Sequence, residues 1–278
     1  MRTGSRRDAR NYPGVFALLI AGLVLAPQTS RATPSPVQTG GYAAPQVRPD
    51  PLLADVTPLR AQDMSIQIAD GHRQLRFTAG LANIGRGPLE VRPDHRRRCG
   101  PAERHASQVI YRDVDDNQRF LRHVDIFKTL RSAGCMAFHP LHDHWHFEAA
   151  SRYRGYRPDR ERDAIVRSRK TSFCLRDSER VPLRLGTFNK PLYYSNCARD
   201  TPQGISTGWV DVYASYLPGQ ALRVPDRLPN GVYCLGIRVD PLDELWESNE
   251  TNNDSARAFR LYRDRVEPVQ SKPCTSAR

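Results

Sequence analysis

The sequence predicts an all-β fold, an antiparallel β-sandwich-like domain with long loops and little helix. Three observations favour this fold. Short runs alternate apolar and polar residues or are rich in β-branched and aromatic residues. Gly, Pro, Asn and Asp separate these runs at short intervals. No segment has the period of an amphipathic helix, so many short strands with turn-rich spacers indicate two packed antiparallel sheets.

The expected strands follow one another from about residue 50. Each one ends where a turn residue or a proline interrupts the pattern. In chain order they are MSIQIAD (64–70), QLRFTAGLANIG (74–85), PLEVRP (88–93), SQVIYRDVD (107–115), QRFLRHVDIF (118–127), GWVDVYASY (208–216) and GVYCLGIRVD (231–240).

The first 49 residues have a different character. Arg6, Arg7 and Arg10 precede the apolar run 15–26, and Ser30 and Ala32 supply small residues for cleavage after Ala32. This layout predicts a signal peptide over residues 1–32 and export, so that the mature chain is secreted or periplasmic. A buried N-terminal helix or an uncleaved anchor is the alternative. The apolar run is shorter than the roughly 20 residues of a membrane span, so we expect no integral membrane segment after cleavage.

A linker and a single domain follow the leader. Residues 33–49 are rich in Pro, Thr, Gln and Gly, as in a flexible linker. The strand-like pattern then defines a domain over residues 50–266, and residues 267–278 form a C-terminal tail.

The cysteine count agrees with export. The chain has six cysteines, and an even number in an oxidising compartment predicts three disulfides. No pair has CxxC spacing, which argues against a zinc ribbon or a thioredoxin-like site. Six cysteines allow fifteen pairings, and spacing alone does not choose among them.

The net charge of +12 comes mostly from arginine, because only four of the 42 basic residues are lysine. Patches such as His95–Arg98 could bind acidic polymers. They are not interleaved with aromatic residues and belong to no nucleic-acid-binding motif, so we expect no nucleic acid partner.

A histidine cluster is the strongest chemical signal. Of the eight histidines, four lie in HPLHDHWHFE (139–148). His142, His144 and His146 are two residues apart, a period that places side chains on one face of a strand. Three imidazoles can hold Cu, Zn, Fe or Ni and leave a position for water, O2 or substrate. His139 could be a fourth ligand or could support the others. The alternative is a surface strand with chance histidines.

Four separated motifs then resemble the catalytic domain of the lysyl oxidase family, in its bacterial type, over roughly residues 48–266. They are the HxHxH run, RKTSFCLRDS (169–178), NCARDTPQGISTGWVDVY (196–213) and VDPLDELWESNETNN (239–253). The resemblance implies that His142, His144 and His146 bind Cu2+. It also implies that Lys170 and Tyr213 form the cofactor lysine tyrosylquinone.

The implied activity is the oxidation of a primary amine by O2 to an aldehyde, with release of ammonia and hydrogen peroxide. Amino-acid side chains lack a good electrophile, and a quinone carbonyl supplies one. A general base must then remove a proton from the substrate carbon. Asp211, on the same strand face as Tyr213, and Glu148, on the histidine face, are both candidates. Arg152 stands where vertebrate members carry a histidine. The amine and the oligomeric state do not follow from the sequence.

The loop 240–254 is dense in carboxylates and amides, which are ligands that suit Ca2+. By resemblance, a structural calcium site would use five residues and pin the start of the domain to this loop, although an ordinary polar turn is an equal alternative. The implied ligands are Asp50, Glu247, Asn249, Asn252 and Asn253.

The same resemblance implies a disulfide between Cys174 and Cys197. It would hold the lysine segment near the segment that leads to Tyr213. Cys99–Cys135 and Cys234–Cys274 are then the simplest remaining pairs.

Two other readings of the sequence stay open. The chain could be a non-catalytic, metal-binding β-sandwich of the cell surface that mediates adhesion or binding. It could also be a metal-only hydrolase or dioxygenase in which Lys170 and Tyr213 take no part. A carbonyl reagent and a peptide map would separate these readings from a quinone enzyme.

Overall fold

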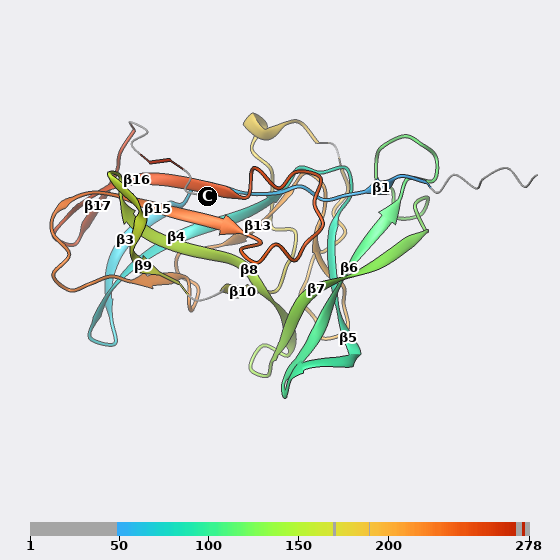
Figure 1. Cartoon of the computed structure of the whole chain (residues 1–278), viewed down its shortest axis with the longest axis horizontal. Helices are drawn as coiled ribbons and strands as arrows, with labels where there is room; N and C mark the ends of the chain where they lie inside the picture. The colour runs from blue at the N-terminus through green and yellow to red at the C-terminus, as the bar shows by residue number, and fades with distance from the viewer. Residues whose placement is uncertain (1–48, 169–170, 189, 271–273, 276–278) are drawn as a thin grey trace, which may run out of the picture. The chain divides into compact units, whose positions relative to one another are not determined.

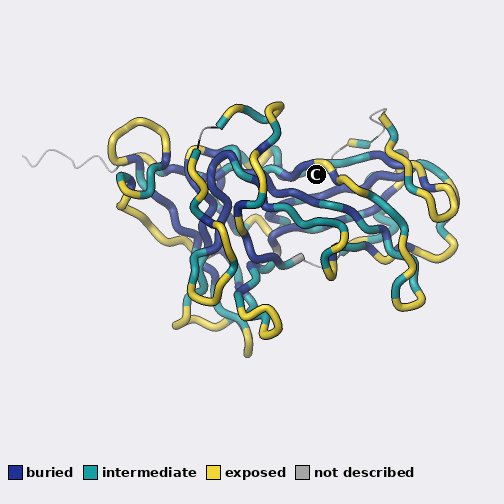
Figure 2. The backbone as a smooth tube through the Cα atoms, turned by 180° about the vertical axis from the view of Figure 1, so that it is seen from behind, coloured by how far each residue is buried: buried dark blue, intermediate teal, exposed yellow. Residues whose placement is uncertain are grey.

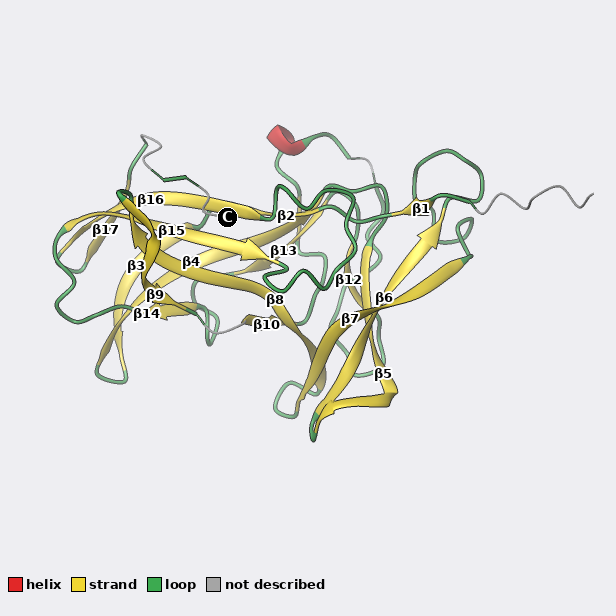
Figure 3. Ribbon diagram, in the orientation of Figure 1, coloured by secondary structure: helices red, strands yellow, loops and turns green. Residues whose placement is uncertain are grey.

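The computed structural model describes residues 49–168, 171–188, 190–270 and 274–275. These residues belong to one compact unit, Val47–Arg278. Strands make up almost all of its regular structure, and Figure 3 shows one short 3-10 helix, η1 (Leu183–Leu185). Within the described ranges, no helix is long and apolar enough to cross a membrane. The predicted all-β class is therefore confirmed.

The larger sheet has eleven strands, and its main path runs β12–β5–β6–β7–β8–β15–β16–β17 (Figure 1). β1 adds to β6, whereas β9 and β10 both add to β8, so β8 is the strand of this sheet with the most partners. The strands are β1 (Pro51–Leu52), β5 (Leu89–Gly100), β6 (Glu103–Arg112), β7 (Lys128–His139), β8 (His144–Arg157), β9 (Arg160–Arg167), β10 (Thr171–Phe173), β12 (Gln203–Ile205), β15 (Gly231–Val239), β16 (Asp254–Tyr262) and β17 (Arg265–Pro268).

The smaller sheet has six strands arranged around β4. Its path runs β11–β13–β4–β14, and β2 and β3 also pair with β4. All of these pairings are antiparallel. The strands are β2 (Val56–Pro58), β3 (Gln62–Ala69), β4 (His72–Asn83), β11 (Glu179–Arg180), β13 (Trp209–Tyr213) and β14 (Ala221–Arg223).

The two sheets share one apolar core. Alternate residues of β4 are buried and meet buried residues of β8, β15 and β16 from the larger sheet. Phe77 of β4 packs edge-on against Tyr153 of β8, with ring centroids 4.8 Å apart. Figure 2 shows the buried residues running along the strands while the connecting loops are exposed. Burial of these inner faces is the main force that holds the layers together.

Three disulfides fasten this sandwich. Cys99 of β5 is joined to Cys135 of β7, and Cys234 of β15 is joined to Cys274. The third joins Cys174 to Cys197, so the described residues contain no free cysteine.

One predicted strand is wrong. Residues 118–127 form turns and loop between β6 and β7. Two buried carboxylates hold this loop, because Asp113 accepts hydrogen bonds from the backbone N–H groups of Asn117 and Gln118. Asp125 likewise accepts hydrogen bonds from the backbone N–H groups of Val114 and Leu121. Local side-chain-to-backbone bonds of this kind compete with strand pairing.

Candidate active site

A cavity of about 610 Å³ lies where the two sheets meet. The larger sheet contributes residues of β8, β9 and β10, and the smaller sheet contributes residues of β13 and β14. The three histidines of the HxHxH run, Asp211 and Tyr213 all line this cavity, together with the disulfide cysteines Cys174 and Cys197. The fold therefore gathers residues from distant parts of the sequence around one opening.

The local structure of the histidines differs from the expected strand. β8 begins at His144, so only His144 and His146 lie on the same strand face. His142 lies in the preceding turn, where Asp143 has a φ of 54°. Trp145 and Phe147 point to the core and are buried. The strand prediction is therefore wrong for His142, although the turn still brings its ring to the other two.

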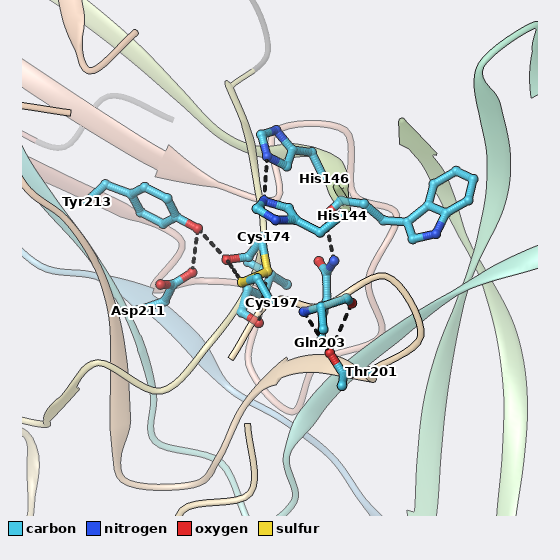
Figure 4. The surroundings of a disulfide bond; sticks show 11 residues. His144, His146, Cys174, Cys197, Thr201, Gln203, Asp211 and Tyr213 are labelled. Carbon is cyan, nitrogen blue, oxygen red and sulfur yellow. Dashed lines mark hydrogen bonds between the residues drawn. A yellow bond between two sulfur atoms is a disulfide. The ribbon is translucent and has the colours of Figure 1, made fainter. Parts of the chain in front are cut away.

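The three imidazoles converge. One nitrogen from each of His142, His144 and His146 lies within 4.8 Å of the others, and the Nε2 atoms of His144 and His146 are 3.1 Å apart (Figure 4). Two imidazole ligands about 2.0–2.1 Å from one ion lie roughly 3 Å apart. Burial, followed by the charge of neighbouring histidines, lowers the pKa of His144 and lowers that of His146 to about 4. Neutral imidazoles with free lone pairs are the form that binds a divalent metal.

His139 completes the cluster at the end of β7. Its ring stacks on that of His142, with centroids 4.0 Å apart, and lies 4.9 Å from that of His146. Its Nδ1 atom is buried and has no hydrogen-bond partner among the described residues. The four imidazoles fit a metal ion of the copper or zinc class, and His139 is close enough to support the other three.

Tyr213 enters the cavity from β13. Its hydroxyl lies 2.7 Å from the carbonyl oxygen of Cys174 and 2.8 Å from Oδ2 of Asp211 (Figure 4). Its ring stacks on Phe173 of β10, with centroids 3.3 Å apart. Burial and the neighbouring Asp211 raise the pKa of Tyr213 well above its ordinary value.

The two hydrogen-bond contacts of the Tyr213 hydroxyl limit which group can supply the hydrogen between Tyr213 and Asp211. A phenol has a single hydrogen to donate, and a carbonyl oxygen can only accept. When Tyr213 donates to Cys174, the hydrogen between Tyr213 and Asp211 must come from the carboxyl group. Burial raises the pKa of Asp211 well above its usual range, which favours the protonated form of this carboxyl group.

Lys170 lies outside the described residues, but the chain on both sides of it reaches the cavity. Ser168 and Ser172 line the cavity. The backbone N–H of Ser168 donates to the carbonyl oxygen of Tyr153, and Thr171 pairs with Ser151 across β8 and β10. The segment that carries Lys170 therefore begins and ends at β8, beside the cavity.

The other candidate base, Glu148, is partly buried on β8, and the described residues that line the cavity do not include it. Gln220, which the sequence analysis did not single out, does line the cavity. It is buried, its Oε1 accepts a hydrogen bond from Tyr153, and its Nε2 has no partner among the described residues. A glutamine after Gly219 in a turn carries no sequence signal for such a position.

The polar loop between β15 and β16 approaches the start of the domain. Glu247 is buried, accepts hydrogen bonds from the Val56 backbone N–H and from Asn253, and has a pKa raised by burial to about 8. Asn252 donates to Asp55, whereas the carbonyl oxygen of Asp50 accepts from Asp113. Asp55 therefore contacts this loop through a side-chain hydrogen bond, whereas Asp50 is exposed.

Two buried amide oxygens of the same loop accept no hydrogen bond from the described residues. The Oδ1 atoms of Asn252 and Asn253 are buried and have no hydrogen-bond partner in the described part of the chain. Asn249, by contrast, is only partly buried, and its side-chain oxygen accepts hydrogen bonds from Thr251. Buried amide oxygens beside a buried carboxylate fit a hard cation such as Ca2+, which takes oxygen ligands.

Comparison with known proteins agrees with this geometry. The family model for lysyl oxidase matches residues 121–271, just over half of the 278-residue chain. The matched segment contains the histidine cluster, both sides of the Lys170 position, Tyr213 and the polar loop. A search of curated proteins gave no match. On the family match, this chain belongs to the lysyl oxidase family, whose members are copper-dependent amine oxidases.

Proposed function

We propose that the chain is an exported, bacterial-type copper amine oxidase that converts primary amines, either peptidyl lysine or small amines, to aldehydes. O2 is the second substrate, and ammonia and hydrogen peroxide are released. The observation that carries this proposal is that one cavity is lined by three converging imidazoles and by Tyr213.

His142, His144 and His146 would hold the copper ion, for which their nitrogen spacing and the lowered pKa values of His144 and His146 are suited. Tyr213 and Lys170 would be joined as lysine tyrosylquinone, which supplies an electrophilic carbonyl for the amine. Ser168 and Ser172 on the cavity wall support this pairing, because they flank Lys170 in the sequence.

The surrounding residues fix the orientation of Tyr213. The stacked Phe173 ring limits rotation of the phenol plane, and the carbonyl of Cys174 anchors the hydroxyl. The Cys174–Cys197 disulfide in turn fixes that carbonyl at the cavity wall. A ring held in this way is preorganised, which lowers the entropy cost of reaching a reactive geometry.

Asp211 would hold and move a proton at the Tyr213 oxygen. Its carboxyl group is buried, its pKa is raised, and it lies 2.8 Å from that oxygen. A carboxyl group with a raised pKa can act as an acid and, once it has lost the proton, as a base. Among the candidates from the sequence, its position in the cavity favours Asp211 over Glu148.

The polar loop would bind Ca2+ in a structural role. The buried carboxylate of Glu247 and the unpartnered amide oxygens of Asn252 and Asn253 support this part of the proposal. Asp55, from the segment before β2, would complete the set of oxygen ligands in place of Asp50. Such an ion would tie the start of the domain to the loop after β15. Three disulfides are in keeping with an extracytoplasmic location.

The test is peroxide release from a panel of primary amines after the purified protein has been loaded with copper. Lys170→Ala and Tyr213→Phe should both abolish release. Lys128→Ala and Tyr216→Phe are matched controls, because both residues are exposed and neither lines the cavity. A Lys170→Ala protein as active as the parent would exclude the quinone mechanism. Copper binding without oxidation of any amine would favour a metal-binding surface module.

A further inference from the structure

A second, smaller cavity of about 220 Å³ adjoins the active-site cavity on the same sheet. Its lining is strongly basic. Among the described residues around it, a single carboxylate, that of Asp254, accompanies four guanidinium groups. The arginines are Arg152 and Arg154 of β8, Arg167 of β9 and Arg238 of β15. We refer to this space as the arginine cavity.

Strand register forces these positive charges together. Arg152 lies directly opposite Arg238 across β8 and β15, and Arg154 lies directly opposite Arg167 across β8 and β9. Like charges in directly opposed positions destabilise a sheet. Arg238 is partly compensated by an ion pair with Asp254 at 3.3 Å. Arg152, Arg167 and Arg238 still outnumber this carboxylate around the cavity, and their positive charge favours an anion that binds among them.

Gly236 of β15 lines the arginine cavity. A Cβ atom at this position would lie 3.3 Å from Cγ of Arg154 and 3.2 Å from a ring carbon of Tyr156. The guanidinium of Arg154 stacks over the Tyr156 ring at 5.0 Å from its centroid. Glycine thus lets the Arg154 side chain lie against β15, and the stacking orders its guanidinium group for ligand binding.

Two residues place the arginine cavity next to the active-site cavity and to the segment that flanks Lys170. Arg167 lines both cavities. Arg152 lies on β8 between Ser151, which pairs with Thr171, and Tyr153, whose carbonyl accepts from the backbone N–H of Ser168. The basic surface is therefore next to the two described residues that most closely flank Lys170.

We propose that the arginine cavity is an anion subsite of the enzyme, which selects primary amines that also carry a carboxylate or phosphate group. The proposal rests on the proposed amine oxidase function and names its substrate class. The planar guanidinium forks of Arg152 and Arg238 match carboxylate and phosphate oxygens in pairs. The anionic group would bind there while the amino group reaches the neighbouring cavity.

Matched pairs of amines test this specificity. The pairs are 6-aminohexanoate against hexylamine, and a blocked Glu-Lys-Glu peptide against a blocked Gln-Lys-Gln peptide. The parent protein should have a higher kcat/KM for the acidic member of at least one pair, and the pair that shows the preference tells whether free or peptidyl amines are used. Added salt should reduce the preference, because it screens charges that remain accessible to water.

Arginine variants locate the effect. In Arg152→Gln/Arg238→Gln, the ratio of kcat/KM for acidic over neutral substrate should fall by about tenfold or more, the size expected for loss of charged hydrogen bonds. Arg227 is exposed and lines neither cavity. The control variant Arg227→Gln, which also removes a positive charge, should therefore keep the parent ratio of kcat/KM values. No acidic preference in the parent, or the same ratio in the double variant, would overturn the subsite.

A substrate analogue without an amine separates this inference from the proposed function. A blocked Glu-norleucine-Glu peptide cannot be oxidised, and its binding can be followed by calorimetry. Binding that weakens in the double variant supports the anion subsite even if no amine is oxidised. Oxidation of amines without any acidic preference, together with no binding of this peptide, contradicts the subsite and leaves the oxidase intact.

Discussion

The Cys174–Cys197 disulfide should stabilise the fold and also hold Tyr213 in place. The double substitution Cys174→Ser/Cys197→Ser removes a link between residues 23 positions apart. The chain-entropy relation gives a loss of ~3.4 kcal/mol in the free energy of unfolding for a link of this length. For a domain of this size, the midpoint of thermal unfolding should fall by roughly 7–14 °C.

The second effect is local. The carbonyl of Cys174 accepts a hydrogen bond from Tyr213 at 2.7 Å, so removal of the link should loosen the phenol. Formation of the quinone should then fall, because the reacting side chains are no longer held near each other. The assay is labelling by a carbonyl reagent after copper loading, at a temperature well below the unfolding midpoint.

Cys234→Ser/Cys274→Ser is a matched control. Its link spans 40 positions, and the same relation gives a loss of ~3.9 kcal/mol. Neither cysteine lines the active-site cavity. This variant should lose as much stability and keep its labelling. Equal labelling of the two double variants would refute the positioning role of the Cys174 link, and a loss of stability well below 1 kcal/mol would refute the entropy argument.

Three further predictions concern the loop, the core and the metal centre. The pKa of Glu247 is raised to about 8 in the folded protein. In the absence of calcium, its protonated carboxyl group therefore stabilises the fold fully below pH 4.5, and this stabilisation is lost as the pH rises through 8. Thermal unfolding with a chelator should show this decline, and both added calcium and Glu247→Gln should reduce it. Phe77→Ala empties a fully buried site and should cost roughly 3–5 kcal/mol in urea unfolding. His146→Ala should lose bound copper in metal analysis, whereas His123→Ala, at an exposed site, should retain it.

The strand pattern of the sequence was sufficient to predict the fold class, because alternating burial is a local signal. It gave the wrong structure for residues 118–127, where the alternation around Leu121 resembles a strand. Asp113 and Asp125 determine that loop through backbone hydrogen bonds, and such bonds leave no periodic trace in the sequence. Likewise, Asp143 has a positive φ in the turn before β8, so the histidine strand begins at His144 and does not include His142.

The site itself depends on contacts between distant segments. The spacing of the histidines and the family resemblance of residues 196–213 indicated the residue types, but neither places Tyr213 beside the Cys174 carbonyl. It also does not show that Asp55, five residues after Asp50, meets the loop of Asn252. Gln220 becomes apparent only from the lining of the cavity, and the opposed arginines Arg152 and Arg238 only from strand register.

The central claim is that the side chains of Tyr213 and Lys170 become covalently joined when copper is bound at the histidines. Peptide mapping by mass spectrometry of copper-loaded protein tests this claim most directly. We expect one crosslinked peptide that contains both residues, absent from metal-free protein and from His146→Ala. Recovery of the two residues in separate, unmodified peptides from fully copper-loaded protein would contradict it.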